Sequence, residues 1–279
     1  MKIGLHGVST HYSNVMTDVR IARDTGYDSL EILSSKILRF LDNEGNIHEL
    51  KKRISDFGLE TGCVNALLSI ERHKGEQKDE MLAEALRLTR VAADLNCPTV
   101  QILALNGIDD KSDTEIMDIM AQNIHEISLI GQKYGVRYQI EVVAFTKFRT
   151  LQQGLSVIER VGQPNVGMVI DFWHLYASGA TPEDVARMDK NLIYGVHFCD
   201  GRLPRKGEAW DQLAQRNYLP GEGEVDIQAW TNAVKSTGYD GLWTAELFSP
   251  KHWEDDLFEI AIQSRETMEK IIGGQNCDV

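Results

Sequence analysis

The sequence predicts a single α/β domain built as a (β/α)₈ barrel, the TIM-barrel fold, over residues 1–272, with residues 273–279 as a flexible tail. Two observations carry this prediction. Eight short apolar segments alternate with longer segments of helical periodicity along 279 residues, a length close to the ~250 residues typical of such barrels. No G-x-G-x-x-G motif follows the first apolar segment, which disfavours the alternative of an open doubly wound sheet.

Each predicted strand is a short apolar run bounded by turn residues, as buried parallel strands are. In chain order the predicted strands are Lys2–His6, Ser29–Leu33, Leu59–Leu68, Thr99–Leu105, Val136–Val143, Val166–Ile170, Leu192–Val196 and Gly241–Leu247. Several of these runs carry a polar or charged residue near their carboxyl end. Parallel α/β folds place their chemistry at those ends.

The segments between the strands repeat apolar residues at helical spacing, and several of them stop at a glycine that can end a helix. In chain order the predicted helices are Val15–Thr25, Ile47–Phe57, Lys78–Asn96, Asp113–Tyr134, Thr150–Val161, one that begins at Thr181–Asp184, Asp226–Thr237 and Asp255–Ile272. The glycines between a helix end and the next strand are Gly26, Gly58, Gly135 and Gly238. Residues 201–217 are expected to form a long polar loop.

The composition restricts the class of protein. A formal net charge of −13 disfavours nucleic acid and anionic membranes as partners. No apolar run approaches the ~20 residues that span a bilayer, and the N-terminus has no signal-peptide pattern, so a cytoplasmic protein is expected. The cysteines form no C-x-x-C pair and are interpreted as free thiols: Cys63, Cys97, Cys199 and Cys277.

Four consecutive predicted strands each offer a metal-binding side chain near the carboxyl end: Glu141, Asp171, His197 and Glu246. A barrel brings these ends together at one face. Three carboxylates and one imidazole suit Mn²⁺, Co²⁺, Zn²⁺ or Mg²⁺, and a divalent ion removes the repulsion among the carboxylates. Taken singly, Asp171 also suits a helix N-cap and His197 a hydrogen-bonded core histidine. The coincidence on four strands favours one divalent metal site.

The chain resembles the xylose-isomerase-like TIM-barrel superfamily, the group of sugar phosphate isomerases and epimerases and of endonuclease IV. The matching stretches are QIEVV, RTLQQGLSVIERVGQPNVGMVIDFWHLYASG, VHFCDG, YLPGEGEVDIQAW and GYDGLWTAELFSP. Members related to inosose isomerase and ketose 3-epimerases carry the same Glu, Asp, His and Glu at these strand ends. The resemblance thus implies that the same four residues bind one divalent ion, and that the protein forms homo-oligomers.

The resemblance also implies roles around that metal. Glu141 and Glu246 would combine metal binding with proton transfer at the carbon next to a carbonyl, through a metal-stabilised enediolate. His174, in a D-x-x-H pair with Asp171, would contact a substrate oxygen or orient Asp171. Arg202 resembles the substrate-binding arginine of the epimerases. The substrate would be a keto sugar or a cyclitol ketone.

Further polar residues fall near the ends of the first four predicted strands: His6, Glu31, Asn65 and Gln101. They would line the substrate pocket opposite the metal, or make structural hydrogen bonds at the rim of the barrel. Arg216, which precedes the turn P-G-E-G, has two readings as well. Related sequences often carry an arginine at that place, and it would otherwise brace the loop.

The leading prediction is a metal-dependent isomerase or epimerase acting on a keto sugar or inosose. A dehydratase of the same superfamily, acting on an inosose or on 3-dehydroshikimate, is the near alternative because both reactions begin with loss of an α-proton. Endonuclease IV-like activity would need more metal ligands and a basic groove, which eight histidines and a charge of −13 do not favour. The third alternative, a sugar-binding subunit without catalysis, is disfavoured by retention of all four ligands.

Overall fold

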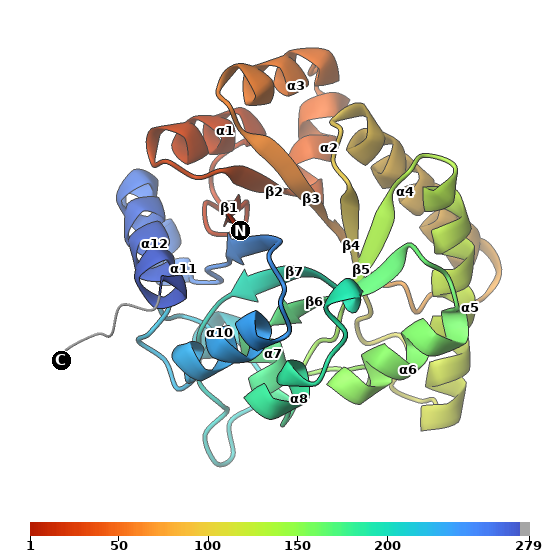
Figure 1. The fold of residues 1–279 in the computed structure, drawn as a ribbon. Helices are drawn as coiled ribbons and strands as arrows, with labels where there is room; N and C mark the ends of the chain where they lie inside the picture. The colour runs from red at the N-terminus through yellow and green to blue at the C-terminus, as the bar shows by residue number, and fades with distance from the viewer. Residues whose placement is uncertain (274–279) are drawn as a thin grey trace.

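The computed structural model describes residues 1–273, in which eight parallel strands close into a barrel in chain order. The last strand pairs with the first through residues 2–5 and 242–245. Figure 1 looks at the face where the strands begin, with the helices arranged around them. The predicted (β/α)₈ fold is confirmed. Of the tail predicted at residues 273–279, only Gly273 lies within the described residues.

The strands are β1 (Lys2–His6), β2 (Ser29–Leu33), β3 (Glu60–Leu67), β4 (Thr99–Leu103), β5 (Arg137–Glu141), β6 (Val166–Asp171), β7 (Ile193–Phe198) and β8 (Leu242–Ala245). The α-helices are α1 (Val15–Asp24), α2 (Ser34–Asp42), α3 (Ile47–Asp56), α4 (Gly75–Asp94), α5 (Asp113–Gln132), α6 (Leu151–Val161), α7 (Phe172–Ala177), α8 (Pro182–Ala186), α9 (Gln212–Gln215), α10 (Ile227–Ser236), α11 (Pro250–Trp253) and α12 (Leu257–Ile272). A short 3₁₀ helix, η1, spans Lys190–Leu192.

All eight predicted strands are present, and the predicted ends of the strands and long helices agree with the structure within three residues. The short elements α2, α7, α9, α11 and η1 were not predicted, and α9 lies within residues 201–217, which were predicted to be a loop throughout. Helices α2 and α7 follow β2 and β6 with no intervening turn. Helix α2 has no side-chain cap, so its start gives no capping signal. Helix α7 consists of apolar and aromatic residues that continue the apolar run of β6, and its cap, Asp171, is also the last residue of that strand.

The recurring glycines have the conformation that their position suggested. Gly26, Gly58, Gly135 and Gly238 have φ angles of 79°, 71°, 68° and 82°. Residues with a Cβ atom are strained in this left-handed region, whereas glycine adopts it readily. Each glycine therefore turns the chain from the end of a helix back towards the start of the next strand.

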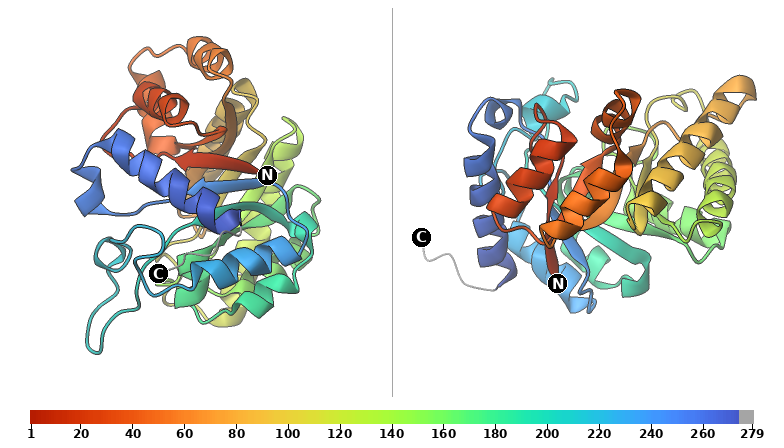
Figure 2. Two further views of the ribbon diagram at one scale, coloured as in Figure 1. Left: turned by 60° about the vertical axis from the view of Figure 1, so that its left-hand side comes forward. Right: turned by 90° about the horizontal axis from the view of Figure 1, so that it is seen from above.

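One apolar core fills the space between the strands and the surrounding helices. Leu5, Leu30, Ile140 and Val196 on four different strands are buried in it and pack with apolar residues of the helices. Figure 2 shows the strands inside the ring of helices, and the segment between β7 and α10 extends from the barrel end opposite the N-terminus. No helix within residues 1–273 is long and apolar enough to cross a membrane. Three cysteines in the described part of the chain are free and buried, Cys63, Cys97 and Cys199.

Candidate metal centre and active site

The four predicted metal ligands meet at the carboxyl end of the barrel. Glu141 and Asp171 are the last residues of β5 and β6, His197 lies on β7, and Glu246 directly follows β8. Each contributes one ligand atom to a group whose members all lie within 4.8 Å of one another. All four side chains are buried. The ring of strands thus brings together residues that are up to 105 positions apart (246 − 141).

The imidazole of His197 faces the three carboxylates with Nδ1. This atom lies 3.4 Å from Glu141 Oε1, 3.6 Å from Glu246 Oε1 and 3.7 Å from Asp171 Oδ2. His197 Nδ1 and Glu141 Oε1 are buried and have no hydrogen-bond partner among the described residues. Buried polar atoms without partners are rare because their desolvation is not compensated. A divalent cation would satisfy both atoms and neutralise the carboxylates, so these residues fit a metal ion.

The opposite edge of the His197 ring is held by Glu31. His197 Nε2 lies 3.1 Å from Glu31 Oε1, to which Asn65 also donates a hydrogen bond of 2.9 Å. Burial opposes ionisation of Glu31, but His197 and His6 hold the pKa of that carboxyl at about 2. Burial opposes the charged form of His197, but Glu246 and Glu31 raise the pKa of its imidazole well above the usual value, so the ring is protonated in the absence of a metal. A cation bound at Nδ1 would displace the proton there, and the ionised Glu31 would keep the remaining proton on Nε2.

Arg216 enters the same site from the segment that follows α9. Its Nη2 donates to Asp171 Oδ2 at 3.2 Å and pairs with Glu246, and its Nη1 lies 3.3 Å from His174 Nε2. His174 Nδ1 accepts a hydrogen bond of 3.2 Å from the backbone N–H of Ala144. Burial lowers the pKa of His174, so its ring is neutral. Arg216 and His174 therefore present two donors beside the candidate metal ligands.

A cavity of about 320 Å³ opens at this end of the barrel. Its polar lining consists of His6, His11, Ser34, Ser35, Asn65, Glu141, His174, Gln212, Arg216 and Glu246. The rest of its wall is apolar and consists of Val8, Leu33, Ala66, Leu68, Leu103, Leu105, Val143, Phe145 and Phe248. Of the four candidate metal ligands, Glu141 and Glu246 line this cavity and the other two do not. A substrate in the cavity would thus meet these two carboxylates directly.

The predicted substrate contacts are divided between this cavity and other places. His6, Asn65 and His174 line the cavity. Gln101 does not line it, and its Nε2 donates to Glu141 Oε2 at 3.0 Å. Arg202 does not line it either, because its guanidinium forms two hydrogen bonds with Glu208, at 2.6 and 2.7 Å.

Arg216 was the residue whose place the sequence could not decide. The structure puts its guanidinium among the candidate ligands, whereas Arg202 remains in the loop. Both arginines belong to the same long segment after β7. The sequence of a loop does not determine its path, so it does not show which arginine reaches the site. The remaining signal was the position of Arg216 just before the P-G-E-G turn.

Asp200, just after β7, organises that turn and is not a member of the metal-type cluster. Its Oδ1 accepts the backbone N–H groups of Gly201 and Val225 at 2.7 and 3.2 Å. Its Oδ2 accepts those of Gly221 and Gly223 at 2.8 and 2.9 Å. One carboxylate thus ties the chain after β7 to the segment that leads into α10.

Replacing Asp200 with asparagine is expected to lower the free energy of unfolding by about 2–3 kcal/mol, because the amide group leaves buried N–H donors without an acceptor. Urea unfolding measures the change. Asp226→Asn is the matched control, since Asp226 caps α10 through the single N–H of Ala229 and asparagine caps equally well. Equal stability of the two variants would contradict the role of Asp200.

The comparisons with known proteins agree with the fold. A family model described as xylose isomerase-like TIM barrel matches residues 19–270. Inosose isomerase from Halalkalibacterium halodurans is 24% identical over 268 residues, covering 93% of this chain and 92% of the relative. A 3-dehydroshikimate dehydratase from Pseudomonas aeruginosa is 22% identical over 80% of this chain but 34% of its own length. The crystal structure of IOLI protein with a binding zinc atom superposes with a TM-score of 0.91 at 23% identity, covering 99% of this chain and all of the other.

Proposed function

The chain belongs to the xylose isomerase-like TIM barrel family, and proteins similar to it include isomerases, epimerases and dehydratases. From this premise we propose that it is a divalent-metal-dependent isomerase or epimerase of a keto sugar or inosose. The observation that carries the proposal is the convergence of Glu141, Asp171, His197 and Glu246, with two of their buried atoms lacking partners. The zinc bound in the IOLI protein, which has the same fold, supports a divalent ion in this protein.

The proposed roles follow from which groups reach the cavity. Asp171 and His197 hold the metal from outside the cavity lining, whereas Glu141 and Glu246 both bind it and face the substrate. A divalent ion bound there would polarise the substrate carbonyl. One glutamate takes the proton from the adjacent carbon, and the other returns a proton from a different side. Strands β5 and β8 are separated by β6 and β7, so the two carboxylates approach the substrate from different parts of the ring.

Arg216 and His174 are proposed to bind a substrate oxygen beside the metal. The guanidinium and the His174 Nε2–H are donors, and both residues line the cavity. Trp173 and Phe248 lie against the guanidinium, whose carbon is 5.2 and 5.5 Å from their ring centroids. These rings restrict where the guanidinium can move. A substrate oxygen would accept hydrogen bonds that Arg216 now donates to Asp171 and Glu246.

A dehydratase remains the second candidate, and the apolar wall of the cavity favours it. The apolar part of the lining includes Val143, Phe145 and Phe248, which offer no hydrogen bonds to the hydroxyls of a fully hydroxylated sugar. The relatives named 3-dehydroshikimate dehydratase match 80% of this chain. In that reaction one glutamate removes the α-proton and passes it to the departing hydroxyl, which leaves as water, while Arg216 and the Nε2–H of the neutral His174 donate hydrogen bonds to that oxygen.

A substrate screen by NMR in D₂O with added Mn²⁺ tests the proposal and separates the two reactions. We expect deuterium to enter the carbon next to the carbonyl of a keto sugar or an inosose, together with a new isomer. Formation of an unsaturated product with loss of water would identify a dehydratase. If the metal-loaded protein catalyses neither exchange nor dehydration across sugars, inososes and 3-dehydroshikimate, the proposed function is wrong.

Replacing Glu31 with glutamine is expected to weaken Mn²⁺ binding by about 10–100-fold, because the uncharged amide no longer makes His197 a strong electron-pair donor. Titration calorimetry with Mn²⁺ measures the change. Glu71→Gln is the matched control, since Glu71 is a buried carboxylate that accepts the backbone N–H groups of Leu105 and Gly107 away from the metal cluster. Equal Mn²⁺ affinity of the Glu31→Gln variant and the parent protein would show that Glu31 does not support the metal.

A further inference from the structure

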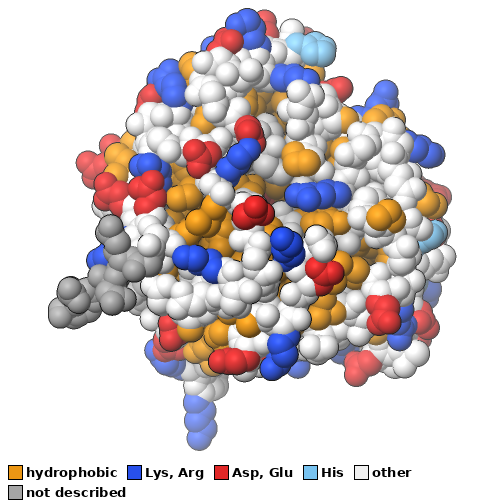
Figure 3. All heavy atoms as spheres, in the orientation of Figure 1, with side chains coloured by type: hydrophobic (Ala, Val, Ile, Leu, Met, Phe, Trp, Pro, Cys, Tyr) orange, Lys and Arg blue, Asp and Glu red, His pale blue; other side chains and the backbone are white. Residues whose placement is uncertain are grey.

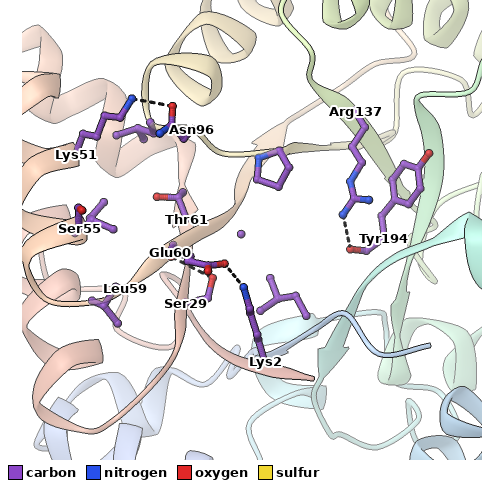
Figure 4. A pocket seen from close by; sticks show the side chains of 15 residues that line it. Lys2, Ser29, Lys51, Ser55, Leu59, Glu60, Thr61, Asn96, Arg137 and Tyr194 are labelled. Carbon is purple, nitrogen blue, oxygen red and sulfur yellow. Dashed lines mark hydrogen bonds and ion pairs between the residues drawn. The ribbon is translucent and has the colours of Figure 1, made fainter. Parts of the chain in front are cut away.

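A second cavity, of about 500 Å³, lies at the opposite end of the barrel, where the strands begin. Figure 3 shows this face of the molecule, and Figure 4 shows the side chains around the cavity. The lining residues are Lys2, Ser29, Lys51, Ile54, Ser55, Leu59, Glu60, Thr61, Gly62, Leu95, Asn96, Pro98, Arg137, Tyr194 and Leu242. None of them lines the candidate catalytic cavity. The two cavities are therefore separate sites.

The charged side chains of this second cavity are mostly basic. Lys2 pairs with Glu60, which is the one acidic residue of the lining. Lys51 Nζ donates to the neutral Asn96 Oδ1 at 2.8 Å, and within residues 1–273 it pairs with no carboxylate. The cavity thus keeps a net positive charge in a chain whose formal net charge is −13.

Arg137 adds a second cation without a carboxylate partner in the described part of the chain. Its Nε donates to Thr99 Oγ1 at 2.9 Å, and its guanidinium carbon lies 4.3 Å from the centroid of the Tyr194 ring. These contacts fix the position of the guanidinium but leave its charge uncompensated. Figure 4 shows Arg137 and Lys51 on opposite sides of the cavity.

The wall between the two cations contains polar groups and one close-packed backbone position. Thr61 is 6% exposed, and its Oγ1 has no hydrogen-bond partner among the described residues. Ser29 Oγ donates to the backbone oxygen of Glu60 at 3.1 Å. A Cβ atom added at Gly62 would lie 2.2 Å from Leu242 Cδ2, so a side chain at this point of the wall would displace its neighbours.

We infer that this cavity binds a small molecule that carries two acidic groups, a dicarboxylate or a bisphosphate. One acidic group would pair with Lys51 and the other with Arg137, and the Thr61 hydroxyl would face the chain that joins them. Charge-assisted hydrogen bonds of this kind are the strong ones, and Arg recognises carboxylate and phosphate through its planar fork. A volume of about 500 Å³ suits a small metabolite. The inference does not depend on the proposed catalytic function.

Titration calorimetry at constant ionic strength tests this inference with three probes: glutarate, propane-1,3-diol bisphosphate and the neutral pentane-1,5-diol. We expect at least one of the two acidic probes to bind with a Kd below about 1 mM and the diol not to bind. The preferred acidic probe distinguishes carboxylate from phosphate chemistry. If neither acidic probe binds more tightly than the diol, the inference is overturned.

A matched pair of lysine variants locates the binding. Lys51→Met should weaken binding of the acidic probe at least tenfold, whereas Lys52→Met on the same helix should not, because Lys52 is 74% exposed and pairs with Asp56. Arg137→Gln should weaken binding as Lys51→Met does, which provides a second variant if one of them folds poorly. Binding should also survive in Glu246→Gln, which changes only the other cavity. Equal affinities of Lys51→Met and Lys52→Met, or loss of binding in Glu246→Gln, would place the acidic probe elsewhere.

Discussion

Replacing Glu141 or Glu246 with glutamine is expected to lower turnover by about 10²–10⁴-fold, the usual contribution of a general acid or base. Glutamine has nearly the same shape and still offers an oxygen to the metal, but it cannot accept the α-proton. Both glutamates line the cavity, so each faces the place that a substrate would occupy. Turnover and solvent deuterium exchange are measured at saturating Mn²⁺, and the metal content of each variant is determined in parallel.

The two assays separate proton transfer from metal binding. In an epimerase with two bases, both variants lose epimerisation. One of them still exchanges deuterium at the α-carbon, because its remaining glutamate removes the proton. A dehydratase loses exchange in one variant only. Glu71→Gln is the control, since Glu71 is buried outside the cavity lining and its loss should leave turnover nearly unchanged. If both variants keep the metal and exchange at the parent rate, neither glutamate is the base, and the proposed proton-transfer roles are wrong.

The parts of the site that could be predicted from the sequence lie next to strong local signals. Glu141, Asp171 and His197 are at or near the end of an apolar run, and the residue's place in the run determines its place in the barrel. The closed barrel then brings the strand ends together without further information. The same reasoning applies to Glu246, which directly follows β8.

The parts that the sequence left open depend on contacts across the barrel or on loop conformation. Glu31 could be placed in β2, but its contact with His197 joins residues 166 positions apart, and no periodicity encodes it. Arg216 reaches the site through a loop whose path is fixed by backbone hydrogen bonds to Asp200. Helix α7 was not predicted because its apolar residues continue the pattern of the preceding strand.

Replacing Asp171 with asparagine is expected to reduce Mn²⁺ affinity by more than the ~10–100-fold that a supporting residue contributes, because the substitution removes a charge from the ligand group itself. Asp171 Oδ2 lies 3.7 Å from His197 Nδ1, and it also accepts a hydrogen bond from Arg216. Asparagine keeps the size of the side chain. Metal content after dialysis and titration with Mn²⁺ measure the effect.

Asp171 has a second task that the experiment must separate from metal binding. Its Oδ1 accepts the backbone N–H of His174 at 2.6 Å and so caps α7. Asparagine is about as good an N-cap as aspartate, so this contact should survive the substitution. Asp226→Asn changes a cap of the same kind on α10, outside the cluster, and should keep the metal. Unchanged metal occupancy in Asp171→Asn would leave Asp171 with its capping role and its contact to Arg216, and the metal would then have to be held by the other three residues.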